Sequence, residues 1–391
     1  MDDAMADSAS QATLSAAEHA AAMRDYMRDG KQRAKQLGNR GPIRLDADGK
    51  LAADIVAAYW THGFYVFENV ISDTELAELR ADVDRVIDGA PAQPNSDTDR
   101  HGRPAYGRDF AKTPYRYARP LSDPLGGTAK NKGRHPVKML GPTPADDAPE
   151  WTVELLDGNL QLMDSCLRLY GHPGLLAIAE AINGVDFVPY NEVTFIKEPG
   201  LGPSVAWHQD GTTHWDADDW DEGAHGFNFM TQLYASTAAN CVWTLPGSHK
   251  LGKVDIKSLV ATSGSERIDG AVPLVCDPGD VMILNRQAVH GSFANTSPDR
   301  RVTLNAGFFP KKRVLNVTTS KLDGETHTYT EERIEQLARL IPIAVSARQQ
   351  YFPEETPYSY KPLEDRSQDT VWDESMRETT LKNYNLIDMY I

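Results

Sequence analysis

The chain has 391 residues, of which 40% are hydrophobic and 25% charged, a composition typical of a globular protein with a large core. Its formal charge of −16 argues against broad binding to nucleic acid or to an anionic membrane, because both would repel it. Cys166, Cys241 and Cys276 form neither a disulfide framework nor a zinc motif. No run reaches the roughly 20 apolar residues of a membrane span, and no apolar signal segment follows the acidic first residues. We therefore expect a cytoplasmic protein with a small-molecule substrate; the sequence leaves its oligomeric state open.

The first predicted elements are helices. A helix is expected around residues 14–36, and residues 1–45 are interpreted as a solvated N-terminal arm. Further on, Ser72 and Glu75 have the form of a capping box, in which each side chain satisfies a free backbone N–H. A helix should therefore begin at Asp73.

The middle of the chain is irregular. Residues 90–150 are interrupted by many Gly and Pro residues, which predicts a long loop insertion. Such loops are often lids or binding loops, so we expect this one to form or border the substrate entrance; an inert disordered insertion is the alternative. Apolar spacing over residues 151–182 predicts helix.

From residue 186 onward, short apolar or alternating runs are separated by turns such as Pro278-Gly279, which predicts strands of a sandwich or barrel. We expect a main domain at 46–320 and a C-terminal extension of helix and loop at 321–391. The predicted strands are 187–190, 193–196, 229–234, 241–245, 271–275, 281–284 and 302–309.

Three residues have the pattern of a metal site. His208 and Asp210 are two positions apart, so in an extended segment both project from one face. A third ligand, His290, follows a Pro-Gly-Asp turn and a buried strand, at the expected start of the next strand. Two His and one carboxylate, with other positions left open, suit non-haem Fe(II) oxygenases.

Several ordered motifs resemble the phytanoyl-CoA dioxygenase family of 2-oxoglutarate-dependent oxygenases. The resemblance covers roughly residues 50–315, about two thirds of the chain. It rests on Gly63-Phe64-Tyr65-Val66, Lys197-Glu198-Pro199-Gly200, Trp207-His208-Gln209-Asp210, Leu245-Pro246-Gly247-Ser248-His249-Lys250, Pro278-Gly279-Asp280-Val281, His290-Gly291-Ser292 and Arg300-Arg301.

This resemblance implies a mainly β fold with flanking helices, built on a double-stranded β-helix (jelly-roll) core. It also implies Fe(II) at the three residues named above, with 2-oxoglutarate and O2 as co-substrates. Ser292 and an Arg shortly after His290 would hold the 2-oxoglutarate carboxylate, and Lys197 and Gln232 are further candidate contacts. The chain departs from the family at Asn240-Cys241, where a Gly is missing, and at Gln232, near where a Trp is common.

Strand alternation selects between the two neighbouring arginines. Arg301, Thr303 and Asn305 share one face of an extended run, whereas Val302 and Leu304 lie on the other. Helices on the outside of the core would cover the apolar set. We therefore expect Arg301, not its neighbour, to point into the iron pocket, where its guanidinium suits a carboxylate.

These features predict a dioxygenase that hydroxylates a small molecule and releases succinate and CO2. Desaturation, cyclisation and demethylation remain open, whereas halogenation is rejected because Asp210 fills the position where chloride would bind. The alternatives are a non-catalytic small-molecule sensor and a metal-dependent hydrolase. Without a Lys/Arg cluster in the sequence, an acyl-CoA is a less attractive substrate than an amino acid, alkaloid, terpenoid or polyketide.

Three other histidines are assigned no metal. His249 is expected to order a turn near the pocket. His214 and His225 flank an acidic, Trp-rich stretch that we interpret as a surface loop.

Overall fold

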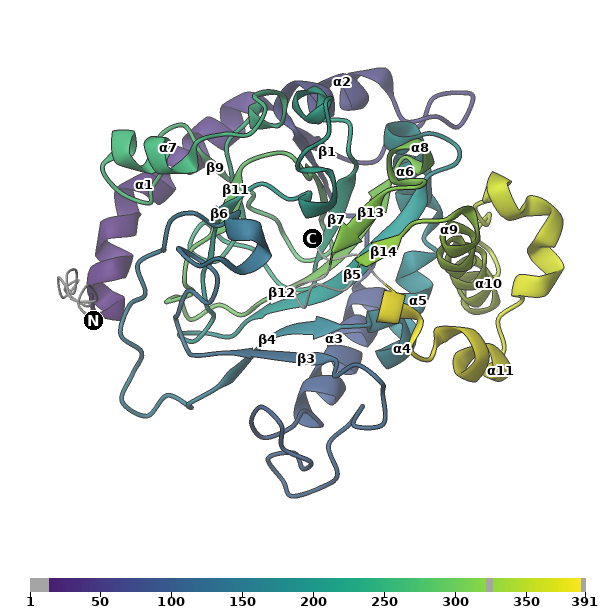
Figure 1. The fold of residues 1–391 in the computed structure, drawn as a ribbon, viewed down its shortest axis with the longest axis horizontal. Helices are drawn as coiled ribbons and strands as arrows, with labels where there is room; N and C mark the ends of the chain where they lie inside the picture. The colour runs from purple at the N-terminus through teal and green to yellow at the C-terminus, as the bar shows by residue number, and fades with distance from the viewer. Residues whose placement is uncertain (1–13, 321–325, 388–391) are drawn as a thin grey trace, which may run out of the picture.

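Two β-sheets facing each other form the centre of the protein (Figure 1), in a computed structural model that describes residues 14–320 and 326–387. The larger sheet has eight strands in the order β1-β2-β10-β7-β12-β5-β4-β3, and the smaller has four in the order β6-β11-β8-β9. The fold is the expected double-stranded β-helix. The strands of the larger sheet are β1 (Arg40–Gly41), β2 (Phe64–Phe67), β3 (Tyr115–Ala118), β4 (Thr152–Asp157), β5 (Val188–Lys197), β7 (Phe227–Gln232), β10 (Val281–Asn285) and β12 (Arg301–Phe309); those of the smaller are β6 (Val205–His208), β8 (Trp243–Thr244), β9 (Val272–Pro273) and β11 (His290–Ser292).

Side chains of the larger sheet alternate between two apolar layers. Met282 and Leu284 of β10 point between the sheets and pack in one cluster with Val272 of the smaller sheet. Val281 and its alternate neighbours point outward instead, into the layer under the helices. The alternation follows from the period of two along a strand.

Helices cover the outer face of the larger sheet and share its largest apolar core. The C-terminal helices belong to this layer, at the opposite side of the molecule from α1 in Figure 1. The helices of this layer are α2 (Ala53–His62), α3 (Asp73–Asp88), α4 (Asn159–Leu162), α5 (Asp164–Tyr170), α6 (Pro173–Asn183), α9 (Glu331–Ala338) and α10 (Leu340–Tyr351). The remaining C-terminal elements are α8 (Lys311–Val314), α11 (Glu374–Met376) and the hairpin of β13 (Thr318–Ser320) and β14 (Thr326–Thr328).

Helix α3 begins at Asp73, as predicted, but only half of the capping box forms. The Ser72 hydroxyl accepts a hydrogen bond from the Glu75 backbone N–H at 3.3 Å. The Glu75 carboxylate binds Arg348 of α10 instead, at 2.7 Å. A long-range ion pair thus takes the side chain that the local motif would use.

Helix α1 (Ala16–Leu37) confirms the helix expected around residues 14–36, but it lies along the smaller sheet and is not part of a solvated arm. Tyr26 stacks on Trp243 with ring centroids 4.4 Å apart. A Cβ atom at Gly30 would lie 2.6 Å from the same indole, so only glycine allows this close approach. Helix α7 (Ile256–Ser263) adds Ile256 to the same apolar cluster.

Residues 151–182 were predicted to be helical throughout, and this prediction was wrong for the first part of the range. Thr152–Asp157 forms strand β4, paired with β5 on one side and β3 on the other. Tertiary pairing overrides the helical apolar spacing there, and Gly158, with φ of 82°, ends the strand. The helical prediction holds for α4, α5 and α6.

Residues 90–150 are mainly irregular, as expected, but ordered into the fold. The segment contains β3 and a short 3-10 helix at Lys130–Gly133, and it buries Leu121, Arg134 and His135. An inert disordered insertion is therefore wrong. In the described ranges, no helix has the length and apolar character needed to span a bilayer.

The Glu75–Arg348 pair gives a stability prediction. Glu75→Ala should destabilise the protein by about 2 kcal/mol, less than the usual 3–5 for a broken buried pair, because Arg348 keeps Glu355 as a partner. Glu378→Ala removes an exposed pair with Lys382 and should cost under about 0.5 kcal/mol. Urea unfolding measures both, and equal losses would contradict a role for this pair in attaching α10.

Candidate functional site

Strand pairing brings the three predicted metal ligands together. His208 ends β6 and lies directly opposite His290, which begins β11. Asp210 follows β6, and its backbone N–H donates to the Arg286 carbonyl at 2.8 Å. The Asp210 carboxylate lies 3.4 Å from His208 Nε2 and 3.9 Å from His290 Nε2. All three residues are buried, and one ligand atom from each lies within 4.8 Å of the others.

Backbone contacts orient both imidazoles for metal binding. His208 Nδ1 lies 2.8 Å from the Ala206 carbonyl, and His290 Nδ1 lies 2.9 Å from the Ala288 carbonyl. A carbonyl only accepts, so each Nδ1 donates and each Nε2 keeps its lone pair for an ion. Burial lowers the pKa of His290 to about 4, which also favours the neutral ligand form. The residues present therefore fit a divalent metal.

The Asp210 carboxylate is held from the opposite sheet. Asn228 of β7 donates its amide N–H to Asp210 Oδ2 at 3.0 Å, and Arg286 donates to the Asn228 amide oxygen at 2.8 Å. Burial alone would raise the pKa of Asp210, but the neighbouring His208 and the positive charge of Arg286 hold that pKa well below its usual value. Asp210 is therefore ionised and fixed in position.

Arg134 and His135, from the irregular segment, complete the surroundings of the ligands. Arg134 donates to the Gln209 carbonyl and lies 3.9 Å from Asp210 Oδ1. The His135 ring stacks on His208 with centroids 4.3 Å apart. Burial and the neighbouring imidazole of His208 lower the pKa of His135 to about 2, so it is neutral. Sequence analysis missed both residues, because no motif marks them.

A cavity of about 690 Å³ contains the three ligands and extends toward the irregular segment. Three of the four predicted co-substrate contacts line it: Lys197, Ser292 and Arg301. Residues between Lys112 and His135 contribute a large share of the lining, as expected for a segment that borders the site. The sequence shows no Lys/Arg cluster, but the folded chain has one. Four basic side chains line this cavity, namely Lys112, Arg116, Lys130 and Arg134.

The strand alternation predicted for β12 is confirmed. Arg301, Thr303 and Asn305 line the cavity, whereas Val302 and Leu304 belong to the apolar core under the helices.

Arg300 makes surface ion pairs 2.6 Å from Asp84 and 3.0 Å from Glu198. Gln232 does not line the cavity. It accepts a hydrogen bond from the Thr303 hydroxyl at 2.9 Å, and that hydroxyl in turn accepts from Arg301 Nε at 2.8 Å. Gln232 therefore orients Arg301, and its direct contact with a co-substrate stays a prediction.

Arg301 is 3% exposed and binds neutral oxygen atoms: those of Thr303 and of the Asn240 backbone, the latter at 2.9 Å. Burial lowers its pKa to about 10, so it is still charged near neutral pH. Lys197 lies opposite Arg301 on the paired strand β5. It is also buried, and it donates a hydrogen bond to the Phe293 carbonyl at 2.5 Å. Burial and the charge of Arg301 lower the pKa of Lys197 well below its usual value. An anion at this end of the cavity would relieve the repulsion between the two side chains.

The other histidines lie away from the metal ligands. His249 Nε2 lies 3.1 Å from the Trp60 carbonyl, in agreement with a structural role. The expectation of a surface loop was wrong for His214 and His225, which are buried and stack with ring centroids 4.4 Å apart. His225 also contacts Asp219 at 2.9 Å, so these rings attach the stretch to the protein, while its residues Asp216, Asp218, Asp221 and Glu222 are exposed as expected for a surface loop.

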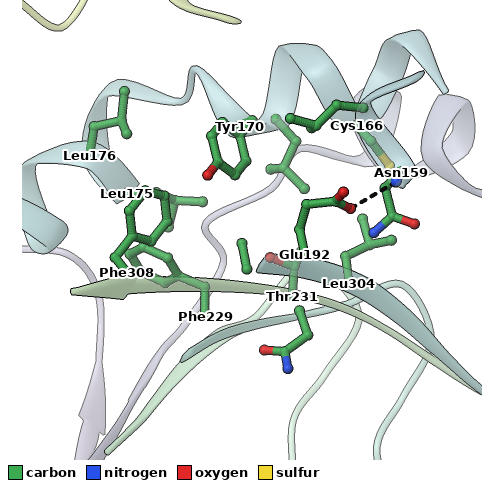
Figure 2. Close-up of a pocket in the computed structure, with 14 residues that line it drawn as sticks. Asn159, Cys166, Tyr170, Leu175, Leu176, Glu192, Phe229, Thr231, Leu304 and Phe308 are labelled. Carbon is green, nitrogen blue, oxygen red and sulfur yellow. Dashed lines mark hydrogen bonds between the residues drawn. The ribbon is translucent and has the colours of Figure 1, made fainter. Parts of the chain in front are cut away.

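A second, much smaller cavity of about 40 Å³ lies between the larger sheet and the helices (Figure 2). Its walls are mainly apolar side chains such as Leu175 and Phe308, and Glu192 accepts a hydrogen bond from the Asn159 backbone at 2.8 Å. Space for about one or two waters excludes a metabolite. The large cavity, which contains the three metal ligands, is therefore the candidate functional site.

Comparison with known proteins shows the family of the chain. A model of the family described as phytanoyl-CoA dioxygenase (PhyH) matches residues 59–303, well over half of the chain, and this range includes the three metal ligands and Arg301. The chain belongs to this family. A curated relative, phytanoyl-CoA dioxygenase 1 from Oryza sativa subsp. japonica, is 30% identical over 115 residues, which cover 28% of this chain and 40% of the rice protein. The match thus spans less than half of that relative.

Solved structures with a similar fold were also found. EctD from S. alaskensis, with 2-oxoglutarate and 5-hydroxyectoine, is 19% identical over 70% of this chain and 84% of EctD, with a TM-score of 0.48. The non-heme alpha ketoglutarate dependent epimerase SnoN from nogalamycin biosynthesis is 16% identical over 69% of this chain and 85% of SnoN, with a TM-score of 0.44.

The hydrogen bond from Asn228 to Asp210 predicts a measurable effect on the metal. Asn228→Ala should weaken Fe(II) binding by about 10- to 100-fold, because it frees the ligand carboxylate to rotate. Asn191→Ala, a change of the same type on the cavity wall, should leave affinity nearly unchanged. Competition with a chromophoric chelator under anaerobic conditions measures both constants. Equal affinities in the two variants would contradict an orienting role for Asn228.

Proposed function

We propose that the chain is an Fe(II)- and 2-oxoglutarate-dependent dioxygenase that hydroxylates a small-molecule substrate and releases succinate and CO2. The observation that carries the proposal is one cavity containing both the buried cluster of His208, Asp210 and His290 and the buried Arg301. The cluster of two His and one Asp suits Fe(II), and the guanidinium of Arg301 suits a carboxylate. Family membership supports the same assignment.

The residues have separate tasks. The two imidazole Nε2 atoms and Asp210 would hold Fe(II) on one face and leave the remaining positions open to the cavity. Fe(II) supplies the redox chemistry by which O2 oxidises 2-oxoglutarate and then the substrate. Arg301 would bind the distal carboxylate of 2-oxoglutarate, with Ser292 and Lys197 beside it. The guanidinium provides two parallel donors and stays charged, which fixes both the position and the orientation of that carboxylate.

The cavity wall also limits the access of water to the metal ligands. Buried groups around the ligands exclude bulk solvent, which strengthens the electrostatic contacts of Arg301 with an anion. Neutral His135, stacked on His208, covers one side of that ligand without adding charge.

Asp210 leaves no space for a chloride ligand at its position, so hydroxylation is the expected outcome rather than halogenation.

Anaerobic reconstitution tests the proposal. The protein should take up about one Fe(II) per chain, and 2-oxoglutarate should then produce the weak visible charge-transfer band of a chelated keto acid. His208→Ala or His290→Ala should abolish iron uptake while the circular dichroism spectrum stays native. A folded, iron-loaded protein without the band would contradict the co-substrate assignment, and turnover without 2-oxoglutarate would favour a metal-dependent hydrolase.

The two arginines of β12 give a paired prediction. Arg301→Ala should weaken 2-oxoglutarate binding by roughly 30-fold or more, since removing one partner of a buried charged pair typically costs about 2–5 kcal/mol. Arg300→Ala should change it little, because that side chain binds Asp84 and Glu198 on the outside. Titration of the visible band gives both affinities. The reverse order would show that a different residue binds the distal carboxylate.

A further inference from the structure

Arg286 is a buried basic residue that lies next to the metal site but outside the lining of the cavity. It follows strand β10 and is 1% exposed. Within the described ranges, its side chain makes one hydrogen bond, from Nη1 to the uncharged amide oxygen of Asn228 at 2.8 Å. Its Nε and Nη2 groups are buried without a hydrogen-bond partner there. In that part of the chain, no carboxylate therefore accepts a hydrogen bond from the guanidinium.

Two aromatic rings hold the guanidinium where a carboxylate would normally be expected. The ring centroids of Tyr190 and Phe309 lie 4.5 and 4.9 Å from Arg286 Cζ. The same two rings contact each other edge to face, with centroids 4.5 Å apart. Such contacts stabilise a cation, but an apolar residue of similar volume is often as stable at a buried position. The positive charge therefore adds little to stability, and its main effect falls on the neighbouring metal site.

Asn228 connects Arg286 to a metal ligand. A guanidinium only donates and an ionised carboxylate only accepts, so the amide between them must turn its oxygen to Arg286 and its N–H to Asp210. The contacts have this arrangement, at 2.8 and 3.0 Å. The backbone joins the same two residues, because the Asp210 N–H donates to the Arg286 carbonyl at 2.8 Å. The positive charge is thus held at a fixed position relative to Asp210.

A fixed positive charge near a metal changes the relative stability of its oxidation states. It repels Fe(III) more strongly than Fe(II), because the trivalent ion carries one more unit of charge, and the protein interior screens this repulsion less than water does. The proposed function requires Fe(II) in the resting protein. We propose that Arg286 is a positioning residue whose charge, acting through Asn228 and Asp210, keeps the bound iron in the ferrous state. This inference rests on the proposed function, because it needs iron at the three ligands.

Redox titration of the iron-loaded protein without 2-oxoglutarate tests the proposal, with the Fe(III) fraction followed by electron paramagnetic resonance. Arg286→Gln and Arg286→Met both remove the charge. Each should raise the Fe(III)/Fe(II) ratio at a given potential by about tenfold or more, which lowers the midpoint of this one-electron couple by about 59 mV or more. Arg286→Lys keeps the charge and should keep most of the midpoint potential. An unchanged midpoint in both charge-free variants would overturn the proposal.

Arg300→Gln is the matched control, because it makes the same charge change at an arginine that pairs with Asp84 and Glu198 on the outside. Surface charges are screened by solvent, so the midpoint potential should stay at that of the unmodified chain. A shift in Arg300→Gln as large as that in Arg286→Gln would reveal a general effect of net charge, and the assignment to Arg286 would be wrong.

Arg286→Met protects the test against loss of folding, since its side chain fills much of the same space without a polar group. If neither charge-free variant folds, Arg286 is needed for the structure itself and the proposal is wrong. The visible band with 2-oxoglutarate separates this inference from the proposed function. A normal band in the unmodified chain, together with unchanged potentials in the variants, refutes the role of Arg286 alone, whereas a missing band refutes the proposed function.

Discussion

The antiparallel pairing of β6 with β11 determines the geometry of the whole site. It places His208 opposite His290, and each imidazole is then fixed by the backbone carbonyl two residues earlier in the chain. The ligand directions are thus set by main-chain atoms rather than by flexible side-chain contacts. Asp210 completes the cluster because its backbone N–H is bound across to Arg286, at the end of β10 in the opposite sheet.

The same site concentrates positive charge in a buried region, which is costly unless anions or dipoles compensate it. Arg286 stacks its guanidinium against Tyr190 and Phe309, at 4.5 and 4.9 Å from the ring centroids. Arg301 binds two neutral oxygen acceptors, and Lys197 one. Such side chains are stabilised more fully when anionic ligands occupy the cavity, so the charge distribution favours binding of a metal complex with acidic co-substrates.

Local sequence patterns predicted what depends on local geometry. The His208–Asp210 spacing, the start of β11 at His290 and the inward direction of Arg301 follow from the two-residue period of a strand, and the structure agrees with each. Arg134 and His135 could not be predicted, because they reach the ligands from an irregular segment with no period. Thr152–Asp157 was predicted as helix because its pairing with β5 depends on residues far away in the chain.

A structure of the chain crystallised anaerobically with Fe(II) and 2-oxoglutarate tests the central claim most directly. We predict one metal ion bound by Nε2 of His208, Nε2 of His290 and the Asp210 carboxylate, with the distal carboxylate of 2-oxoglutarate paired to Arg301. A metal bound elsewhere, or 2-oxoglutarate with its distal carboxylate away from Arg301, would contradict this account.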